Sequence, residues 1–282
     1  MTPYAELPFP RTDVARSALR FAAAVEHPAI FHHSLRTYLY GRAAGERRGL
    51  RPGRDYDDEL LFLGCVLHDA GLSDAGNGDQ RFDLDGADLA ARFLTEAGVP
   101  AERVEVVWDA VALHLCFDLA QRKRPEIALV SAGAGLDLGD EDPPVLPPGY
   151  ADRVHAALPR LHAAAVLHDT IVAQARAKPH KAPPFSMPGE LLRQVTGQRW
   201  PTWRELNEAG PWNDYAGLPP EADDARDAAD EAQKAPRGAP RTPEATEATE
   251  AIEEAEGTEE NERTGGTGGA GRAERGGRAR DA

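Results

Sequence analysis

An unbroken apolar run that ends in two polar residues is the feature that most constrains the fold. Residues 60–67, Leu-Leu-Phe-Leu-Gly-Cys-Val-Leu, are followed directly by His68 and Asp69. The run is well short of a membrane span, so it predicts a buried helix of a globular domain. Gly71 then ends the helical turn. The imidazole and the carboxylate are thereby left at the C-terminal end of the helix, where they can bind one divalent metal ion between them.

Two residues cannot fill a coordination sphere, so this pair requires ligands from elsewhere in the chain. The best candidates are His33 upstream and Asp137 downstream, each in a different predicted helix. Two imidazoles and two carboxylates form a mixed nitrogen and oxygen set, which suits one divalent ion such as Zn²⁺ or Fe²⁺. The neighbouring His32 competes with His33 for the first position.

A second His-Asp pair in the same chain serves as a comparison. His168 and Asp169 follow the apolar run 163–167. No glycine ends the helix after this pair, and no carboxylate in a helical context follows to complete a site. We therefore interpret His168 and Asp169 as structural.

The chain reads as helices joined by short loops, and no stretch alternates with period two for long enough to predict a strand. Thr12 or Asp13 caps the first helix, and Asp55 or Asp57 caps the helix that carries His68. The expected helices cover about residues 12–26, 28–49, 57–67, 84–97, 101–115, 125–137, 150–158 and 160–177. The fold class is all-α, with small residues at 131–135 that allow close packing of the helix carrying Asp137.

Composition divides the chain into three parts. From residue 221 to 282 the only large aliphatic side chain is Ile252, and there are no aromatic ones. Such a segment buries too little apolar surface to offset the entropy of ordering, so residues 219–282 are predicted to be a disordered acidic tail. Residues 1–179 are predicted to be a helical metal-binding domain. Residues 180–218 contain three of the four tryptophans among prolines and are predicted to be an irregular docking arm.

Charge and targeting signals limit the kinds of partner that we expect for this protein. The tail has 17 acidic and 9 basic side chains, so it carries −8 of the net −15 and leaves about −7 on the rest. A moderately acidic domain argues against binding a phosphate backbone, and we expect no nucleic-acid partner. The N-terminus has no signal peptide pattern, so we expect a soluble cytoplasmic protein without a membrane partner. Cys65 is expected to be a small buried hydrophobe.

The order His…His-Asp…Asp resembles the HD superfamily of metal-dependent hydrolases. Four segments narrow the resemblance to its cyanamide hydratase-like branch: residues 31–38 (Phe-His-His-Ser-Leu-Arg-Thr-Tyr), 67–72 (Leu-His-Asp-Ala-Gly-Leu), 82–87 (Phe-Asp-Leu-Asp-Gly-Ala) and 112–114 (Ala-Leu-His). The resemblance covers about residues 7–179. It selects His33 over His32, because the family histidine is followed directly by a small polar residue. It also implies a mononuclear site, because Phe82 stands where two-metal phosphodiesterases have an additional histidine.

The resemblance implies hydration or hydrolysis by a metal-activated water, with conversion of cyanamide to urea as the model reaction. Asp69 or His114 would manage the proton, and Asp137 would complete the shell of the ion. Arg36 and Asp85 are candidates for orienting the ligands. The expected partner is a small neutral substrate. The aspartates 74, 79, 83 and 85 follow the metal pair, and we expect them to repel a phosphate, less so where they pair with Arg81 or Arg36.

Two alternatives stay open. The same four ligands serve HD-type phosphohydrolases of nucleotides or phosphomonoesters. Such a site should gather Arg and Lys around the pocket, and the only such cluster, residues 122–124 (Arg-Lys-Arg) near His114, is explained equally well as a solvated loop. The second alternative is a non-catalytic helical module with a structural metal. The oligomeric state is also open, and a homo-oligomer is compatible with the sequence.

Overall fold

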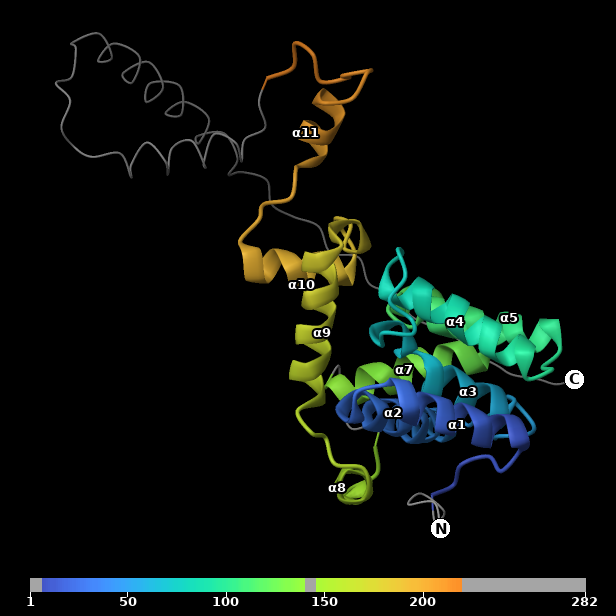
Figure 1. The fold of residues 1–282 in the computed structure, drawn as a ribbon. Coiled ribbons are helices and arrows are strands. Elements are labelled where there is room, and N and C mark those ends of the chain that lie inside the picture. Colours follow the sequence, from blue (N-terminus) through green and yellow to red (C-terminus); the bar gives the residue numbers. More distant parts are fainter. Residues whose placement is uncertain (1–6, 140–145, 220–282) are drawn as a thin grey trace, which may run out of the picture. The chain divides into compact units, whose positions relative to one another are not determined.

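The computed structural model describes residues 7–139 and 146–219, and these residues form helices without a β-strand (Figure 1). The α-helices are α1 (Asp13–Val25), α2 (Pro28–Arg47), α3 (Asp58–Leu67), α4 (Phe82–Glu96), α5 (Ala101–Leu113), α6 (Phe117–Ala120), α7 (Pro125–Leu138), α8 (Tyr150–Ala157), α9 (Ala163–Ala177), α10 (Met187–Thr196) and α11 (Trp203–Glu208). Two short 3₁₀ helices, η1 (Ala70–Leu72) and η2 (Pro179–Lys181), follow α3 and α9. The predicted all-α class is confirmed.

Local capping residues set most of the helix ends where the sequence placed them. The Thr12 side chain accepts a hydrogen bond from the backbone of α1, and Asp57 accepts two from the first turn of α3. Pro28 occupies the first turn of α2, where its missing N–H costs no hydrogen bond. Helix α9 begins at Ala163 and not at residue 160, because the backbone takes a left-handed turn at His162 just before it, with φ of 60°.

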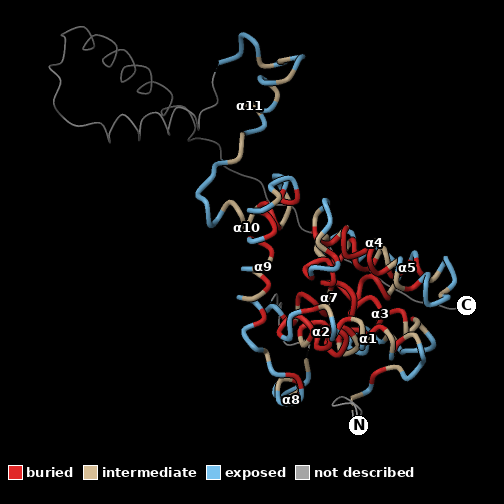
Figure 2. The backbone as a smooth tube through the Cα atoms, viewed as in Figure 1, coloured by how far each residue is buried: buried red, intermediate tan, exposed pale blue. Residues whose placement is uncertain are grey.

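The core lies around α3, which is buried along its whole apolar run. Figure 2 shows α2, α3 and α7 buried over most of their length. Helices α1, α2, α5 and α7 all pack against α3. Full burial of one large aliphatic or aromatic side chain contributes about 1.5–3 kcal/mol, so this helix is firmly fixed. Its C-terminal end, with His68 and Asp69, is therefore held in a defined position. Cys65 is buried and free, as expected.

Helices α2 and α7 approach each other closely because α7 has small residues at the contact. A Cβ atom on Gly133 would lie 2.1 Å from the backbone oxygen of Thr37, which no real side chain could tolerate. The predicted role of the small-residue stretch is thus confirmed. The close approach brings Asp137 of α7 next to His33 of α2.

Polar contacts attach α9 and η2 to the rest of the helical body. Lys181 is buried, and its Nζ donates to Asp85 Oδ2 at 2.7 Å and to Gly78 O at 3.1 Å. Gln174 Nε2 donates to Gly71 O at 3.0 Å, two residues after Asp69. These bonds hold α9 against the loop that follows His68 and Asp69.

The segment 180–218 contains two helices, α10 and α11, which the sequence analysis did not expect. Trp203 and Trp212 are 74% and 85% exposed. Phe185 and Trp200 contact each other edge to face, with their ring centroids 4.9 Å apart. Docking through the tryptophans and the boundary at 179 stay predictions.

The predicted tail, residues 219–282, lies outside the described residues except for Pro219. No helix of the described parts has the length and apolar character that a bilayer span needs.

Candidate metal centre

Three side-chain donor atoms converge at the end of α3. His33 Nε2 lies 3.2 Å from His68 Nε2, and Asp69 Oδ2 lies 3.2 Å from His68 Nε2 and 3.6 Å from His33 Nε2. Donors bound tetrahedrally at about 2.1 Å from one Zn²⁺ ion are separated by about 3.4 Å. All three residues are buried, and among the described residues they form the one group of this kind. The donor set and its spacing are therefore compatible with one divalent ion.

The backbone around His68 orients its ring. His68 follows the last residue of α3, and its Nδ1 donates to Cys65 O at 2.7 Å. That bond fixes the proton on Nδ1 and leaves the lone pair of Nε2 directed at the cluster, as is usual for metal-binding histidines. Asp69 leaves the helical conformation. Gly71 then lets η1 approach the start of α4, where a Cβ atom would lie 1.9 Å from Phe82 O.

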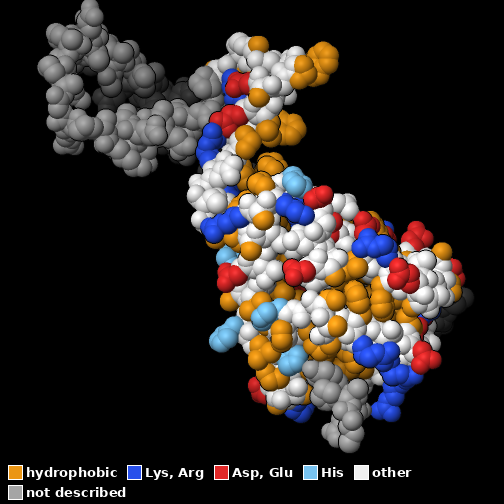
Figure 3. All heavy atoms as spheres, viewed as in Figure 1, with side chains coloured by type: hydrophobic (Ala, Val, Ile, Leu, Met, Phe, Trp, Pro, Cys, Tyr) orange, Lys and Arg blue, Asp and Glu red, His pale blue; other side chains and the backbone are white. Residues whose placement is uncertain are grey.

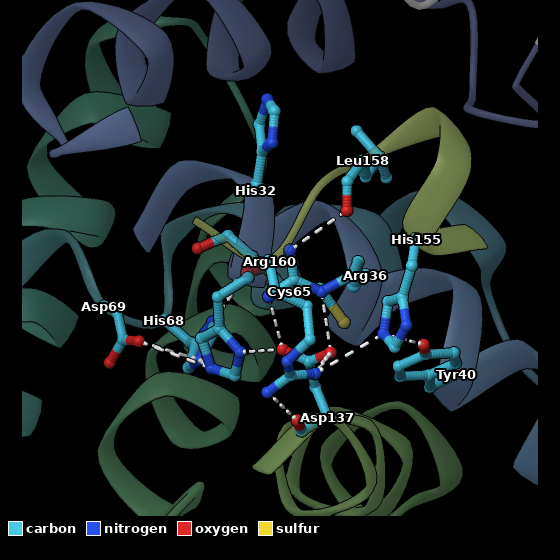
Figure 4. Close-up of polar contacts among 12 residues, drawn as sticks. His32, Arg36, Tyr40, Cys65, His68, Asp69, Asp137, His155, Leu158 and Arg160 are labelled. Atoms are coloured by element: carbon cyan, nitrogen blue, oxygen red, sulfur yellow. Dashed lines mark hydrogen bonds and ion pairs between the residues drawn. The ribbon is translucent and has the colours of Figure 1, made fainter. Parts of the chain in front are cut away.

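Asp137 lies beside His33, on the Nδ1 side of the imidazole, whereas the cluster lies on the Nε2 side. Its Oδ2 is 2.7 Å from His33 Nδ1 (Figure 4). Arg36 donates to both of its carboxylate oxygens at 2.7 Å, and Arg160 donates to Oδ1 at 3.1 Å. The structure thus brings Asp137 to the ring of a cluster residue without placing it among the three donor atoms. That Asp137 binds the ion directly stays a prediction.

The charge of Asp137 is stabilised by its surroundings. Burial raises the pKa of its carboxyl group, but the hydrogen bonds from His33 and Arg36 outweigh burial and hold the pKa well below its usual range. An ionised Asp137 fixes the proton of His33 on Nδ1 and leaves Nε2 free to bind a metal. Arg36 is fully buried and reaches Asp137 rather than the cluster, so the structure makes it a residue that positions Asp137.

His114 lies at the edge of the cluster. Its Nδ1 donates to Val111 O at 2.6 Å, and its Nε2 lies 3.8 Å from Asp69 Oδ1. Burial lowers the pKa of His114 to about 4. The ring is therefore neutral at neutral pH and presents an unprotonated nitrogen toward the site.

The remaining candidates lie outside the cluster. The ring of His32 points away from it in Figure 4, and its Nδ1 lies 3.0 Å from Pro159 O. Asp85 pairs with Lys181 and does not contact a cluster residue in the described structure. The Phe82 ring lies 5.9 Å from that of His114, so an apolar side chain occupies this flank of the cluster.

The expectation that the loop aspartates repel a phosphate needs correction. Asp83 pairs with Arg81, and Asp79 lies 3.1 Å from Lys178. Asp85 forms the buried pair with Lys181. Three of the four aspartates are therefore matched by a cation within ion-pair distance, and the loop presents far less negative charge than the sequence indicated.

A cavity of about 360 Å³ opens on the cluster. His33, His68, Asp69 and His114 line one side of it. Much of the rest is apolar, and its lining residues include Leu167 and Ile171 of α9 and Met187 and Leu191 of α10. A helix over residues 160–177 was expected from the sequence, but its position beside the site was not, and α10 was not expected at all. His168, interpreted as structural, also lines the cavity, while its Nδ1 contacts Asp169 at 2.9 Å.

Arg160 is another residue that sequence reasoning missed. It follows α8 and donates to both the carboxylate and the backbone oxygen of Asp137, at 3.1 and 2.8 Å. A lone arginine after a proline gives no pattern from which this contact could be inferred. Only the fold brings it to a residue 23 positions earlier in the chain.

Comparison with known proteins agrees with this geometry. Residues 30–157 match the HD domain family model, and this range includes His33, His68, Asp69, His114 and Asp137. The chain is similar to cyanamide hydratase DDI2 and cyanamide hydratase DDI3 of Saccharomyces cerevisiae, each 29% identical over 115 residues. These residues are 40% of this chain and 50% of each yeast protein, so the chain spans about half the length of the curated relatives it matches. Residues 30–157 therefore match an HD domain, and the predicted resemblance to the cyanamide hydratase-like branch of HD proteins is confirmed.

Proposed function

We propose that this protein is a mononuclear metal-dependent hydratase that adds water to the nitrile group of a small neutral substrate, as in the conversion of cyanamide to urea. The observation that carries the proposal is the buried donor group of His33, His68 and Asp69 on a cavity with no Lys or Arg among its described lining residues. The similarity to two yeast cyanamide hydratases supports the reaction class.

His33 Nε2, His68 Nε2 and Asp69 Oδ2 would hold the ion, Zn²⁺ or Fe²⁺, with Asp137 as the proposed fourth ligand or as the group that orients His33. A divalent ion held by these residues would lower the pKa of water toward neutrality and so supply a nucleophile at neutral pH. The other carboxylate oxygen of Asp69, Oδ1, is not one of the three donor atoms. It lies 3.8 Å from His114 Nε2.

The protein's own residues would then manage the protons. Hydration forms a bond between the oxygen of water and the nitrile carbon, and both hydrogens of the water end on the product, which is an amide or a urea. His114 is neutral and unprotonated at Nε2, so it can accept a proton from the water and return it to the nitrile nitrogen. The hydrogen bond from His114 Nδ1 to Val111 O would hold the ring in the orientation for this transfer.

The main alternative is an HD-type phosphohydrolase. A phosphate would need cations in the cavity, and the arginines that contact Asp137, Arg36 and Arg160, are already paired with it. In the cluster at 122–124, Lys123 pairs with Asp109 and Arg124 with Glu126, and neither lines the cavity. On the face drawn in Figure 3, Lys and Arg side chains are dispersed among acidic and hydrophobic ones. The charge distribution therefore favours a neutral substrate.

A non-catalytic module with a structural metal is the second alternative. A structural site is closed by protein ligands on all sides. Here the donor group faces a cavity of about 360 Å³, which is within the usual size range of ligand pockets. The open cavity favours catalysis.

Metal analysis of the purified protein, followed by a substrate panel, tests the proposal. We expect about one divalent ion per chain, and release of urea from cyanamide that disappears after chelation and returns with Zn²⁺ or Fe²⁺. Nucleotides and p-nitrophenyl phosphate serve as the comparison substrates. Phosphate release from these esters by metal-replete protein that forms no amide or urea from any nitrile would favour the phosphohydrolase instead.

A further inference from the structure

The cavity beside the cluster is much larger than cyanamide requires. Its volume of about 360 Å³ equals the liquid volume of roughly a dozen water molecules, at about 30 Å³ each. Cyanamide is a nitrile with a single amino group and would fill only a small part of that space. A small polar substrate would leave the rest of the cavity to water in contact with apolar walls, which gives no binding free energy.

The part of the cavity away from the cluster is lined by apolar side chains. Leu115 and Leu138 come from the region that matches the HD domain. Leu167, Ile171, Met187 and Leu191 come from α9 and α10, which lie beyond residue 157. These four residues form an apolar wall, here called the α9–α10 wall. It adds to the side chains that residues 30–157 supply to the cavity.

The α9–α10 wall is firmly attached to the site. Its residues Leu167 and Ile171 belong to a buried cluster with Ile30, Leu72 and Phe82. Beyond the end of α9, Lys181 forms its buried ion pair with Asp85. Within α9, Gln174 donates to Gly71 O, two residues after Asp69. The wall is therefore a fixed side of the cavity, held by both apolar packing and charge pairing.

We propose that the substrate is a nitrile with an apolar alkyl or aryl substituent, and that the α9–α10 wall selects this substituent. This inference rests on the proposed hydratase function. The nitrile carbon lies at the cluster of His33, His68 and Asp69, and the substituent fills the apolar part of the cavity. Burial of one methylene group strengthens binding about fourfold, so kcat/KM should rise about fourfold for each carbon until the cavity is full.

The test compares cyanamide with N-alkyl cyanamides of increasing chain length and with phenylcyanamide, using metal-replete full-length protein and measuring kcat and KM for each. We expect the longer substrates to exceed cyanamide in kcat/KM by tenfold or more, mainly through a lower KM. A flat or falling series, with cyanamide turned over at least as well, would overturn the inference and leave the hydratase function standing.

A pair of variants localises the effect. Ala164 is exposed on α9 and lines the cavity, whereas the adjacent Ala165 is exposed and does not line it. Ala164→Phe should fill part of the cavity and lower kcat/KM for the alkyl substrates at least tenfold, with cyanamide nearly unchanged. Ala165→Phe is the matched control and should leave the whole series unchanged. Equal effects of the two variants, in proteins with unchanged melting temperature, would contradict the assigned wall.

Binding separates this inference from the hydratase function. Calorimetric titration with alkylureas of increasing length should show tighter binding with each methylene, and Ala164→Phe should abolish the trend. This trend without turnover of any nitrile would retain the apolar site and refute the hydratase. Absence of the trend would refute the apolar site whatever the catalytic result.

Discussion

Replacement of Asp137 by asparagine separates the two roles that this residue can have. In the structure, Asp137 accepts two hydrogen bonds of 2.7 Å from the fully buried Arg36 and one contact of 2.7 Å from His33 Nδ1. Asparagine keeps the shape of the side chain but removes its charge. The guanidinium of Arg36 then has no anionic partner at this position.

The loss of stability follows from burial of that charge. Removing one partner of a buried ion pair costs about 3–5 kcal/mol, because the other charge remains uncompensated. With a urea slope of about 2–3 kcal/mol/M, the midpoint of unfolding of the metal-free protein should fall by about 1–2 M. Asp109→Asn is the control: Asp109 pairs with the partly exposed Lys123, and such pairs contribute about 0–1 kcal/mol.

The effect of Asp137→Asn on metal affinity shows whether Asp137 orients His33 or binds the ion itself. If Asp137 orients His33, Asp137→Asn should weaken metal binding by about 10–100-fold, as other changes behind a metal-binding histidine do. Metal affinity is measured by competition with a chelator of known affinity, in the absence of urea, where the variant is folded. A loss as large as that of His68→Ala would refute the supporting role and establish Asp137 as a ligand.

Three further predictions follow from the fold and the site. His68→Ala should remove both bound metal and turnover, whereas His168→Ala should retain its metal. Full metal content in His68→Ala, measured by mass spectrometry, would exclude the cluster as the metal site. Gly133→Ala should destabilise the protein by about 1–3 kcal/mol in urea unfolding, because its Cβ would lie 2.1 Å from Thr37 O, and an unchanged midpoint would mean that α2 and α7 separate easily. Truncation after Pro219 removes one large aliphatic side chain and should leave activity and melting temperature unchanged; a fall of several degrees would show that the removed part contributes to stability.

Sequence by itself determined most of the longer helices and the donor types, because both depend on local chemistry, whereas α6, α10 and α11 were not expected from it. Thr12, Pro28 and Asp57 mark helix starts through bonds to atoms only a few residues away. The apolar run before His68 required a buried helix, which in turn required the imidazole and carboxylate at its end to lie at the edge of the core. These inferences need no knowledge of distant parts of the chain.

Tertiary structure alone decided which side chains meet. Arg36 and Arg160 reach Asp137 across separations of 101 and 23 residues, and Lys181 reaches Asp85 across 96. The sequence did not show that Asp79 and Asp85 pair with Lys178 and Lys181, and it therefore overestimated the negative charge near the site. In the same way, it indicated a helix at residues 160–177 without showing that this helix lines the cavity beside the candidate metal centre. Periodicity reports that a helix face is buried, but what that face packs against depends on the path of the whole chain.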